Sequence, residues 1–337
     1  MRLFICEYVS GGGVLGMPLP QSLAREGDMM LGALVKDVAA IGGIDIVTTR
    51  DARLGHADLP AECHAVEGDE PPWPLWQAIA EEADAVWPIA PETGGALLRF
   101  SNLAAAAGRT LLGSAPAAVA VAASKRATAD RLAASSVPVV PTMRADDVSQ
   151  DSLPVGDHGW VLKPDDGAGA ESTRLFRRRE DLLAALAIAP DLQGWVVQPF
   201  IPGTPASLSL ICRDGDAGLL SCNRQDVVID GEIFRYRGSL VGALDSRRAA
   251  FEPIAAAVVE AIPGLWGYIG IDLVDAPHGP LVLEVNPRLT TSYVGLGRAI
   301  GMNPAELVLR LTSTSIDGLR ASFAVVPGHV EVPALHA

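Results

Sequence analysis

The chain has 337 residues, 49% of them hydrophobic, and its 26 Lys and Arg against 40 Asp and Glu give a net charge of -14. This length exceeds one ordinary core and predicts two or three units, and the acidity excludes the basic face typical of nucleic-acid binders. Four scattered cysteines without metal or CxxC spacing favour a reducing cytoplasm. We expect no signal peptide and no membrane span, because the longest uncharged stretch, 110–124, is short and broken by Gly and Pro.

The N-terminal part alternates predicted strands with predicted helices. Apolar β-forming runs predict strands at 2–9, 44–49, 84–90 and 111–116, and helical spacing predicts helices at 28–42, 74–82 and 95–107. This alternation is typical of a parallel sheet with helices on both faces, and it defines a first unit over residues 1–117.

A glycine-rich loop, SGGG, follows the first predicted strand. Its spacing differs from the GxGxxG fingerprint and no acid ends a clear second strand, so we do not expect nicotinamide or flavin binding. Open α/β sheets bind ligands at the carboxyl ends of their strands, which makes Ser10, Gly11 and Gly12 candidate substrate contacts. Glu92 in PETGG holds an equivalent position and either contacts substrate or caps the following helix.

Beyond residue 117 the pattern becomes α+β. We expect helices at 117–134, 180–187, 251–262 and 303–312 and strands at 160–164 and 195–201. After residue 205 antiparallel strands dominate, and a hairpin across APHG joins YIGIDLVD to GPLVLEVN. The second and third units therefore span residues 118–200 and 201–337.

Lys163 stands in an apolar predicted strand, WVLKP, where a charge costs free energy unless an anion meets it. The next segment, DDGAGAEST, is small and flexible, and the N–H groups of Gly167, Ala168 and Gly169 can surround phosphate oxygens. It lacks the GKS or GKT ending of a Walker loop. Lys125 alone reads as a solvated surface charge.

The run WVVQPFIPG reads as a strand that enters a hinge. It is either an ordinary strand end or, in a nucleotide site, a segment that places Gln198 and Phe200 beside adenine.

The strand LVLEVN carries Glu284 and Asn286 on one face, because side chains alternate along a strand. The hairpin turn sets Asp272 opposite Leu283 or Glu284. Two carboxylates and an amide are hard oxygen ligands that suit Mg²⁺ or Mn²⁺. Arg288 would then present a fork of donors to the same phosphates. The alternative is a surface hairpin with chance polar residues.

In chain order, Lys125, KPDDGAGA, QPFIPG, IGIDLV and LEVNPRL resemble the ATP-grasp superfamily over residues 110–300. Within it, EYVSGGG, PETGG and NPRLTTSYVGL look like the tyramine–glutamate ligases, which serve methanofuran-type coenzymes. The resemblance implies an α/β and α+β ATP-grasp fold with an N-terminal Rossmann-like (pre-ATP-grasp) unit that binds substrate.

The resemblance also implies roles for individual residues. Lys125 and Lys163 would hold ATP phosphates, and Gln198 and Phe200 would border adenine. Asp272, Glu284 and Asn286 would bind Mg²⁺, and Arg288 would steady the transferred phosphoryl group. Many members have a carboxylate after the hinge that binds ribose; here Pro205 and Ala206 occupy that region, and Gln198 replaces a more usual acid.

The implied activity is an ATP-dependent carboxylate–amine ligation through an acyl phosphate. Its partners would be a small acid, such as glutamate, a small amine, such as tyramine or tyrosine, and a second copy of the chain in a homodimer. Further candidate substrate contacts are Asn223, Gln225, Thr290, Thr291 and Tyr293, although Tyr293 equally fits ordinary packing. A kinase-like phosphotransferase and a non-catalytic nucleotide sensor remain alternatives.

Overall fold

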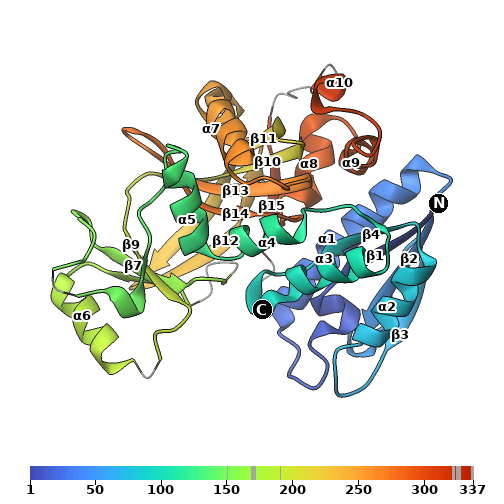
Figure 1. Ribbon diagram of the computed structural model, residues 1–337, viewed down its shortest axis with the longest axis horizontal. Helices are drawn as coiled ribbons and strands as arrows, with labels where there is room; N and C mark the ends of the chain where they lie inside the picture. Colours follow the sequence, from blue (N-terminus) through green and yellow to red (C-terminus); the bar gives the residue numbers. More distant parts are fainter. Residues whose placement is uncertain (150, 168–171, 190, 321–322, 324–327, 335–337) are drawn as a thin grey trace.

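The protein is seen here as a computed structural model that describes residues 1–149, 151–167, 172–189, 191–320, 323 and 328–334. A five-stranded sheet lies at one end of the molecule and a small unit at the other, with the longest strands between them (Figure 1). Ala168 and Gly169 fall outside the described residues.

The N-terminal sheet is parallel throughout, with strand order β3-β2-β1-β4-β5. Its strands are β1 (Arg2–Glu7), β2 (Asp45–Asp51), β3 (Glu62–Val66), β4 (Ala85–Ile89) and β5 (Thr110–Leu111). Leu3 and Ile5 pack with α1 (Gln21–Ile41), whereas Phe4 and Cys6 pack with α2 (Trp73–Glu82) and α3 (Ala96–Ala106). The predicted α/β unit is thus confirmed. The strand order reverses beside β1, between β2 and β4, which is where such sheets bind ligands.

Three predicted boundaries before residue 135 were wrong. The strand expected at 111–116 is only two residues long, as β5, and the helix expected from residue 28 begins at Gln21. The helix expected at 117–134 is two helices, α4 (Pro116–Ala122) and α5 (Lys125–Ala134). It breaks because Ser124 is extended (φ -109°, ψ 119°) and its hydroxyl accepts the Ala127 N–H, which starts a new helix.

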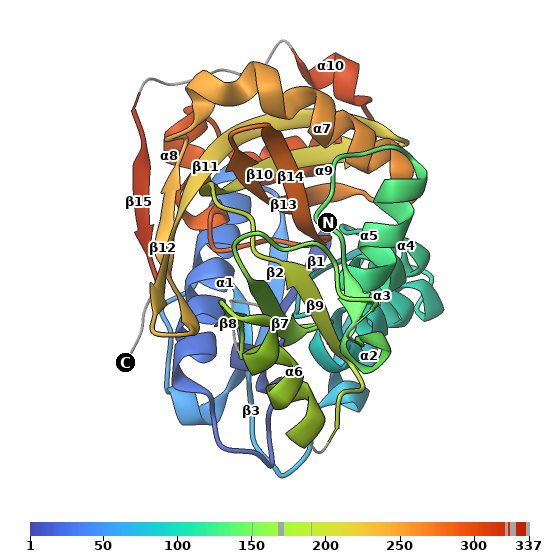
Figure 2. The same ribbon diagram turned by 90° about the vertical axis from the view of Figure 1, so that its left-hand side faces the viewer.

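Ten strands of the described chain form the second sheet, in the order β14-β13-β10-β11-β12-β8-β7-β9-β6, with β15 also paired to β12. The large part comprises β10 (Thr204–Arg213), β11 (Asp216–Asp230), β12 (Ile233–Val241), β13 (Gly267–Ala276), β14 (Gly279–Asn286) and β15 (Val330–Pro333). The small part comprises β6 (Met143–Arg144), β7 (Trp160–Pro164), β8 (Arg174–Phe176), β9 (Trp195–Pro199) and helix α6 (Arg179–Ile188). Neighbouring strands run antiparallel, which confirms the prediction for the chain after residue 205 and also holds for β7 and β9. Figure 2 shows α7 (Arg248–Ala261) lying across the large part.

One apolar core joins the first unit to the C-terminal helices α8 (Tyr293–Ile300), α9 (Pro304–Arg310) and α10 (Ile316–Arg320). Leu31, Leu34 and Val38 of α1 belong to the same cluster as Leu296 and Val308. The small unit has a separate core that includes Leu162, Leu182 and Val197. Among the described strands, β8 of the small unit pairs with β12 at Ile233 and Arg174.

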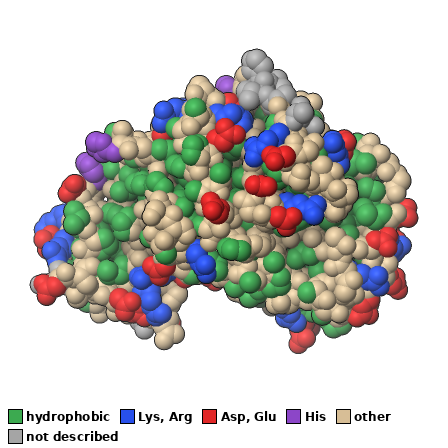
Figure 3. Space-filling model, turned by 45° about the horizontal axis from the view of Figure 1, so that its top comes forward, with side chains coloured by type: hydrophobic (Ala, Val, Ile, Leu, Met, Phe, Trp, Pro, Cys, Tyr) green, Lys and Arg blue, Asp and Glu red, His purple; other side chains and the backbone are tan. Residues whose placement is uncertain are grey.

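Basic and acidic side chains are intermixed over the face in Figure 3, and the described residues there form no large basic patch. Within the described residues, no helix has the length and apolarity that crossing a bilayer requires.

Candidate active site

The hairpin of β13 and β14 brings the predicted metal ligands together. Asp272 lies opposite Glu284 and Gly270 opposite Asn286, in the predicted register. Asn286 Nδ2 donates to Asp272 Oδ2 at 3.3 Å, and Gln225 Nε2, from β11, donates to Oδ1 at 3.0 Å. Val285 points to the opposite face, into the core, and is 1% exposed. The alternation therefore holds three oxygen-bearing side chains on one patch.

The two carboxylates of this patch are electrostatically coupled. Burial raises the pKa of Asp272 well above its ordinary value, and the neighbouring Glu284 raises it further. Burial acts the same way on Glu284, but Lys125 and Lys163 outweigh it and lower its pKa to about 2. A divalent cation would relieve the repulsion on Asp272, so the donor set fits Mg²⁺ or Mn²⁺.

Lys125 and Lys163 approach Glu284 from two other elements. Lys125 begins α5, with Nζ 3.2 Å from Glu284 Oε2, and it donates to the Gly167 carbonyl at 2.6 Å. Lys163 lies on β7 and is 9% exposed. Burial and the charge of Lys125 together lower its pKa to about 8, against the opposing effect of Glu284. Lys125 is therefore not a solvated surface charge, because both lysines are buried beside the carboxylates.

Asp165, which the sequence did not single out, anchors the loop after β7. Its Oδ1 accepts the Arg126 N–H at 2.8 Å, and its Oδ2 accepts the Ser124 hydroxyl at 2.6 Å. Its carbonyl accepts from Lys125 Nζ at 3.2 Å. The loop that carries Gly167 is thereby tied to the start of α5.

The same loop also contacts the first unit. Thr93 Oγ1 donates to the Asp166 carbonyl at 2.9 Å, and the Gly94 N–H donates to Asp166 Oδ2 at 3.1 Å. These bonds close the loop over the carboxyl end of β4, beside Glu92.

Glu92 pairs with Arg288. Arg288 Nη2 lies 2.8 Å from Glu92 Oε2, and Nε lies 3.0 Å from each carboxylate oxygen. Glu92 makes no side-chain capping bond to the turn that follows, and its carboxylate is engaged by Arg288 instead. Asp272 and Glu284 both act electrostatically on Arg288, which places its guanidinium beside the candidate metal patch.

The glycine-rich loop forms the turn η1 (Val9–Gly13) at the end of β1. Ser10 is buried, and its N–H donates to Glu7 Oε2 at 2.6 Å. The Gly11 carbonyl accepts from Thr49 Oγ1 at 3.1 Å, and Gly12 has a φ of 106°, which favours glycine. Glu7 is a second residue that the sequence did not single out; the signal was an acid closing an apolar strand.

The hinge residues lie at the end of β9. Gln198 is 1% exposed and donates through Nε2 to Thr142 Oγ1 at 2.8 Å. The Phe200 N–H donates to the Gly159 carbonyl at 2.8 Å, so that donor is already used. The Phe200 ring lies 6.3 Å from the Phe234 ring, centroid to centroid.

Some of the remaining candidates lie at the carboxylate patch, and others are packed inside the protein. Gln225 contacts Asp272, but Asn223 is fully buried and bonded to Ser207 and Ser209 within the sheet. Tyr293 is buried and donates to Asp37 of α1 at 3.0 Å, which favours its packing interpretation. The hydroxyls of Thr290 and Thr291 bond to those of Tyr268 and Tyr236, at 3.1 and 3.0 Å.

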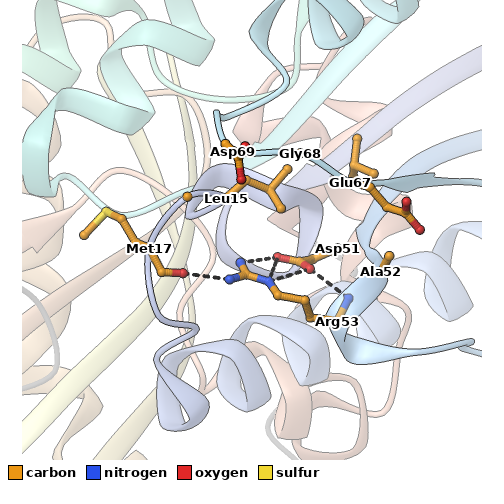
Figure 4. A pocket seen from close by; sticks show the side chains of 10 residues that line it. Leu15, Met17, Asp51, Ala52, Arg53, Glu67, Gly68 and Asp69 are labelled. Atoms are coloured by element: carbon orange, nitrogen blue, oxygen red, sulfur yellow. Dashed lines mark hydrogen bonds and ion pairs between the residues drawn. The ribbon is translucent and has the colours of Figure 1, made fainter.

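A separate pocket of about 530 Å³ lies at the ends of β2 and β3 (Figure 4). Asp51 ends β2, so the expectation that no acid closes the second strand was wrong. Its carboxylate is already engaged by Arg53, at 2.6 and 2.9 Å. None of the candidate residues above lines this pocket.

The fold and the clustered lysines, carboxylates and arginine define one class of protein: the chain belongs to the ATP-grasp family. An ATP-grasp domain matches residues 122–292, and a pre-ATP-grasp domain matches residues 44–119. This agrees with the expected ATP-grasp fold and its N-terminal unit.

Among curated proteins, the tyramine–L-glutamate ligase of Methanocaldococcus jannaschii is 34% identical over 123 residues. That match spans 35% of this chain and 36% of the relative, so about a third of the relative's length is compared. An ATP-grasp superfamily protein from Archaeoglobus fulgidus has a similar structure, with TM-score 0.70, 26% identity, and 92% and 88% of the two chains covered. The biotin carboxylase domain of Hydrogenobacter thermophilus 2-oxoglutarate carboxylase, crystallised with MgADP, shares the fold at TM-score 0.73 and 14% identity over 96% and 72% of the chains.

Proposed function

We propose that the protein is an ATP- and Mg²⁺-dependent ligase that joins a carboxylate to an amine through an acyl phosphate. The observation that carries the proposal is the convergence of Lys125, Lys163 and Arg288 on Asp272 and Glu284. Three cationic side chains beside two carboxylates suit a nucleoside triphosphate with its metal ion. The phosphate oxygens would bind the cationic side chains, and the metal ion would bind the carboxylates.

In this proposal each part of the chain has a defined task. Lys125, Lys163 and the loop at Gly167 hold the phosphates of ATP, while Gln198 and Phe200 border adenine. Asp272, Glu284 and Asn286 hold Mg²⁺ or Mn²⁺, which when bound would neutralise phosphate charge. Arg288 steadies the phosphoryl group as the acid's carboxylate oxygen attacks the γ-phosphorus and ADP leaves. Positioning and charge neutralisation therefore supply the catalysis.

We propose glutamate and an aromatic amine such as tyramine as the substrates, because the curated relative carries that name. Ser10, Gly11 and Gly12 lie at the strand ends of the first unit, and Thr290 and Thr291 follow the metal patch. In this proposal both groups border the acyl phosphate that Arg288 steadies. A homodimer remains a prediction that sedimentation or light scattering would check.

The test is ADP release with Mg²⁺ across a panel of acids, each with and without amines. A ligase releases ADP in proportion to amide formed, and both products require the acid and the amine. ADP release that depends on the acid alone, with a stable phosphorylated product, would instead identify a phosphotransferase. ATP binding with no turnover across the whole panel would identify a sensor.

A further inference from the structure

Glu7 is a buried carboxylate beside the candidate site that the roles above do not use. It ends β1, is 3% exposed, and binds the Ser10 N–H through one oxygen. Within the described residues no Lys, Arg or His lies within ion-pair distance of it, and Arg288 acts on it only at longer range. Since Arg288 is already engaged by Glu92, these three side chains hold two carboxylates against one cation. The excess negative charge suits a cationic ligand group.

Ser10 supplies a second, independent observation. Its side chain is fully buried, and its Oγ makes no hydrogen bond of ordinary geometry within the described part of the chain. It lies close enough to Glu7 to lower the pKa of that carboxyl. The Ser10 hydroxyl is thus only weakly engaged by Glu7, and a ligand group that reaches Glu7 would complete its hydrogen bonding.

The surroundings of Glu7 fix its position and its protonation. Cys6 precedes Glu7 on β1. Helix α1 packs its Gly27 against Glu7 so closely that a Cβ at this position would lie 2.4 Å from the Glu7 carboxylate. Burial raises the pKa of Glu7 to about 7, and the N–H groups of Ser10 and Val9 and the charge of Arg288 oppose that rise. A carboxyl with a pKa near neutrality accepts a proton efficiently at physiological pH.

We propose, on the basis of the ligase function above, that Glu7 and Ser10 bind the primary ammonium group of the acceptor amine and that Glu7 takes its proton. One proton passes from the ammonium to the Glu7 carboxylate. The neutral amine forms the C–N bond at the acyl carbon while the bond from that carbon to the phosphate oxygen breaks. Phosphate leaves with that electron pair and carries away the second amine proton as hydrogen phosphate.

The test compares two nucleophiles on the Glu7→Gln variant. Hydroxylamine is mostly uncharged at neutral pH and needs no base, whereas an alkylamine arrives as an ammonium. We expect amide formation from the alkylamine to fall about 100-fold or more, and hydroxamate formation to stay within several-fold of wild type. Glu70→Gln, an exposed acid on the same unit, is the matched control. Equal loss with both nucleophiles, or no loss with the alkylamine, would overturn the proposal.

The wild-type protein offers a second measurement that does not depend on the variant folding. With Glu7 as proton acceptor, kcat/KM for an alkylamine levels off above about pH 7, because the ammonium form itself binds. Without it, the rate keeps rising about tenfold per pH unit toward the amine's own pKa of about 10.4. A separate measurement tests the ligase function itself. If no acyl phosphate forms, ATP labelled with an oxygen isotope will show no positional exchange that depends on the carboxylic acid substrate when the amine is left out.

Discussion

Arg288 and Glu92, 196 residues apart in the chain, meet through a fork of hydrogen bonds at the boundary between the first and third units. Both side chains are nearly buried, at 11% and 7% exposed. Removing one partner of such a pair leaves an uncompensated charge, so the pair ties the position of Arg288 to the presence of the N-terminal sheet.

Arg288→Lys should abolish most turnover while leaving ATP bound. Lysine keeps the charge but cannot reproduce the planar fork toward Glu92 and the phosphoryl group. We expect ADP release to fall about 100-fold or more, as for loss of one preorganised donor, and the Kd for ATP to change only several-fold. Steady-state kinetics measure the rate of ADP release, and calorimetry measures the Kd for ATP. Arg298→Lys, at an exposed position of α8, is the control, and near-normal turnover of Arg288→Lys would contradict the assigned role.

Asp272→Asn should stabilise the metal-free protein and remove its response to Mg²⁺. Burial and Glu284 raise the pKa of Asp272, so in the absence of metal its contribution to stability decreases as pH rises above the ordinary Asp range. A neutral amide removes that cost at neutral pH. We expect a Tm a few degrees higher without metal, and no further rise with Mg²⁺ and ATP, in thermal unfolding. Asp216→Asn, exposed on β11, should change neither quantity. A lower metal-free Tm for Asp272→Asn would argue against the coupled pair.

ATP affinity should weaken as pH rises above about 8. Burial lowers the pKa of Lys163 to about 8 in the ligand-free protein, and bound phosphate would raise it by favouring the charged form. Affinity is therefore constant below that pKa and falls above it, as the proton must be taken up on binding. Calorimetric titration of ATP from about pH 7 to about pH 9.5, an interval that brackets the pKa of Lys163, measures the effect. Lys163→Arg stays charged and should flatten the profile; an unchanged slope in that variant would exclude Lys163 as its source.

Ser124→Ala should loosen the start of α5 and the loop that it holds. The Ser124 hydroxyl caps the helix and donates to Asp165, so its loss should lower the free energy of unfolding by about 1 kcal/mol. Because Lys125 is the next residue, ATP affinity should fall with it. Denaturant unfolding and ATP titration measure the two effects. Ser135→Ala, at the exposed end of the same helix, is the matched control. Loss of stability with unchanged ATP affinity would mean that the cap does not position Lys125.

The carboxylate patch was predictable because strand geometry constrains it strongly. In LVLEVN the alternation leaves one face for Glu284 and Asn286, and a one-residue slip would turn Val285 out of the core. A short hairpin turn then leaves few choices for the residue opposite, and Asp272 was among them.

The remaining features depend on contacts that are distant in sequence. The run 117–134 is rich in Ala, and its break is marked in the sequence by one serine only, Ser124, which caps α5 and also bonds to Asp165 from another element. Glu7 closes an ordinary apolar strand, and only the packing of Gly27 against it shows that it is buried. The edge strands β3 and β15 are short and partly exposed, so they lack the apolar pattern that identifies a strand.

The apolar cluster shared by α1, α8 and α9 bears on how the chain melts. Separating residues 1–117 from the rest would expose Leu31 and Leu34 on one piece and Leu296 and Val308 on the other. The sequence-based division into three units is therefore not a division into three independently stable bodies. The N-terminal sheet and the C-terminal helices should lose structure together in one cooperative transition. The small unit has its own core, so it can open separately once the bonds of Asp165 to α5 and of Asp166 to the first unit are broken.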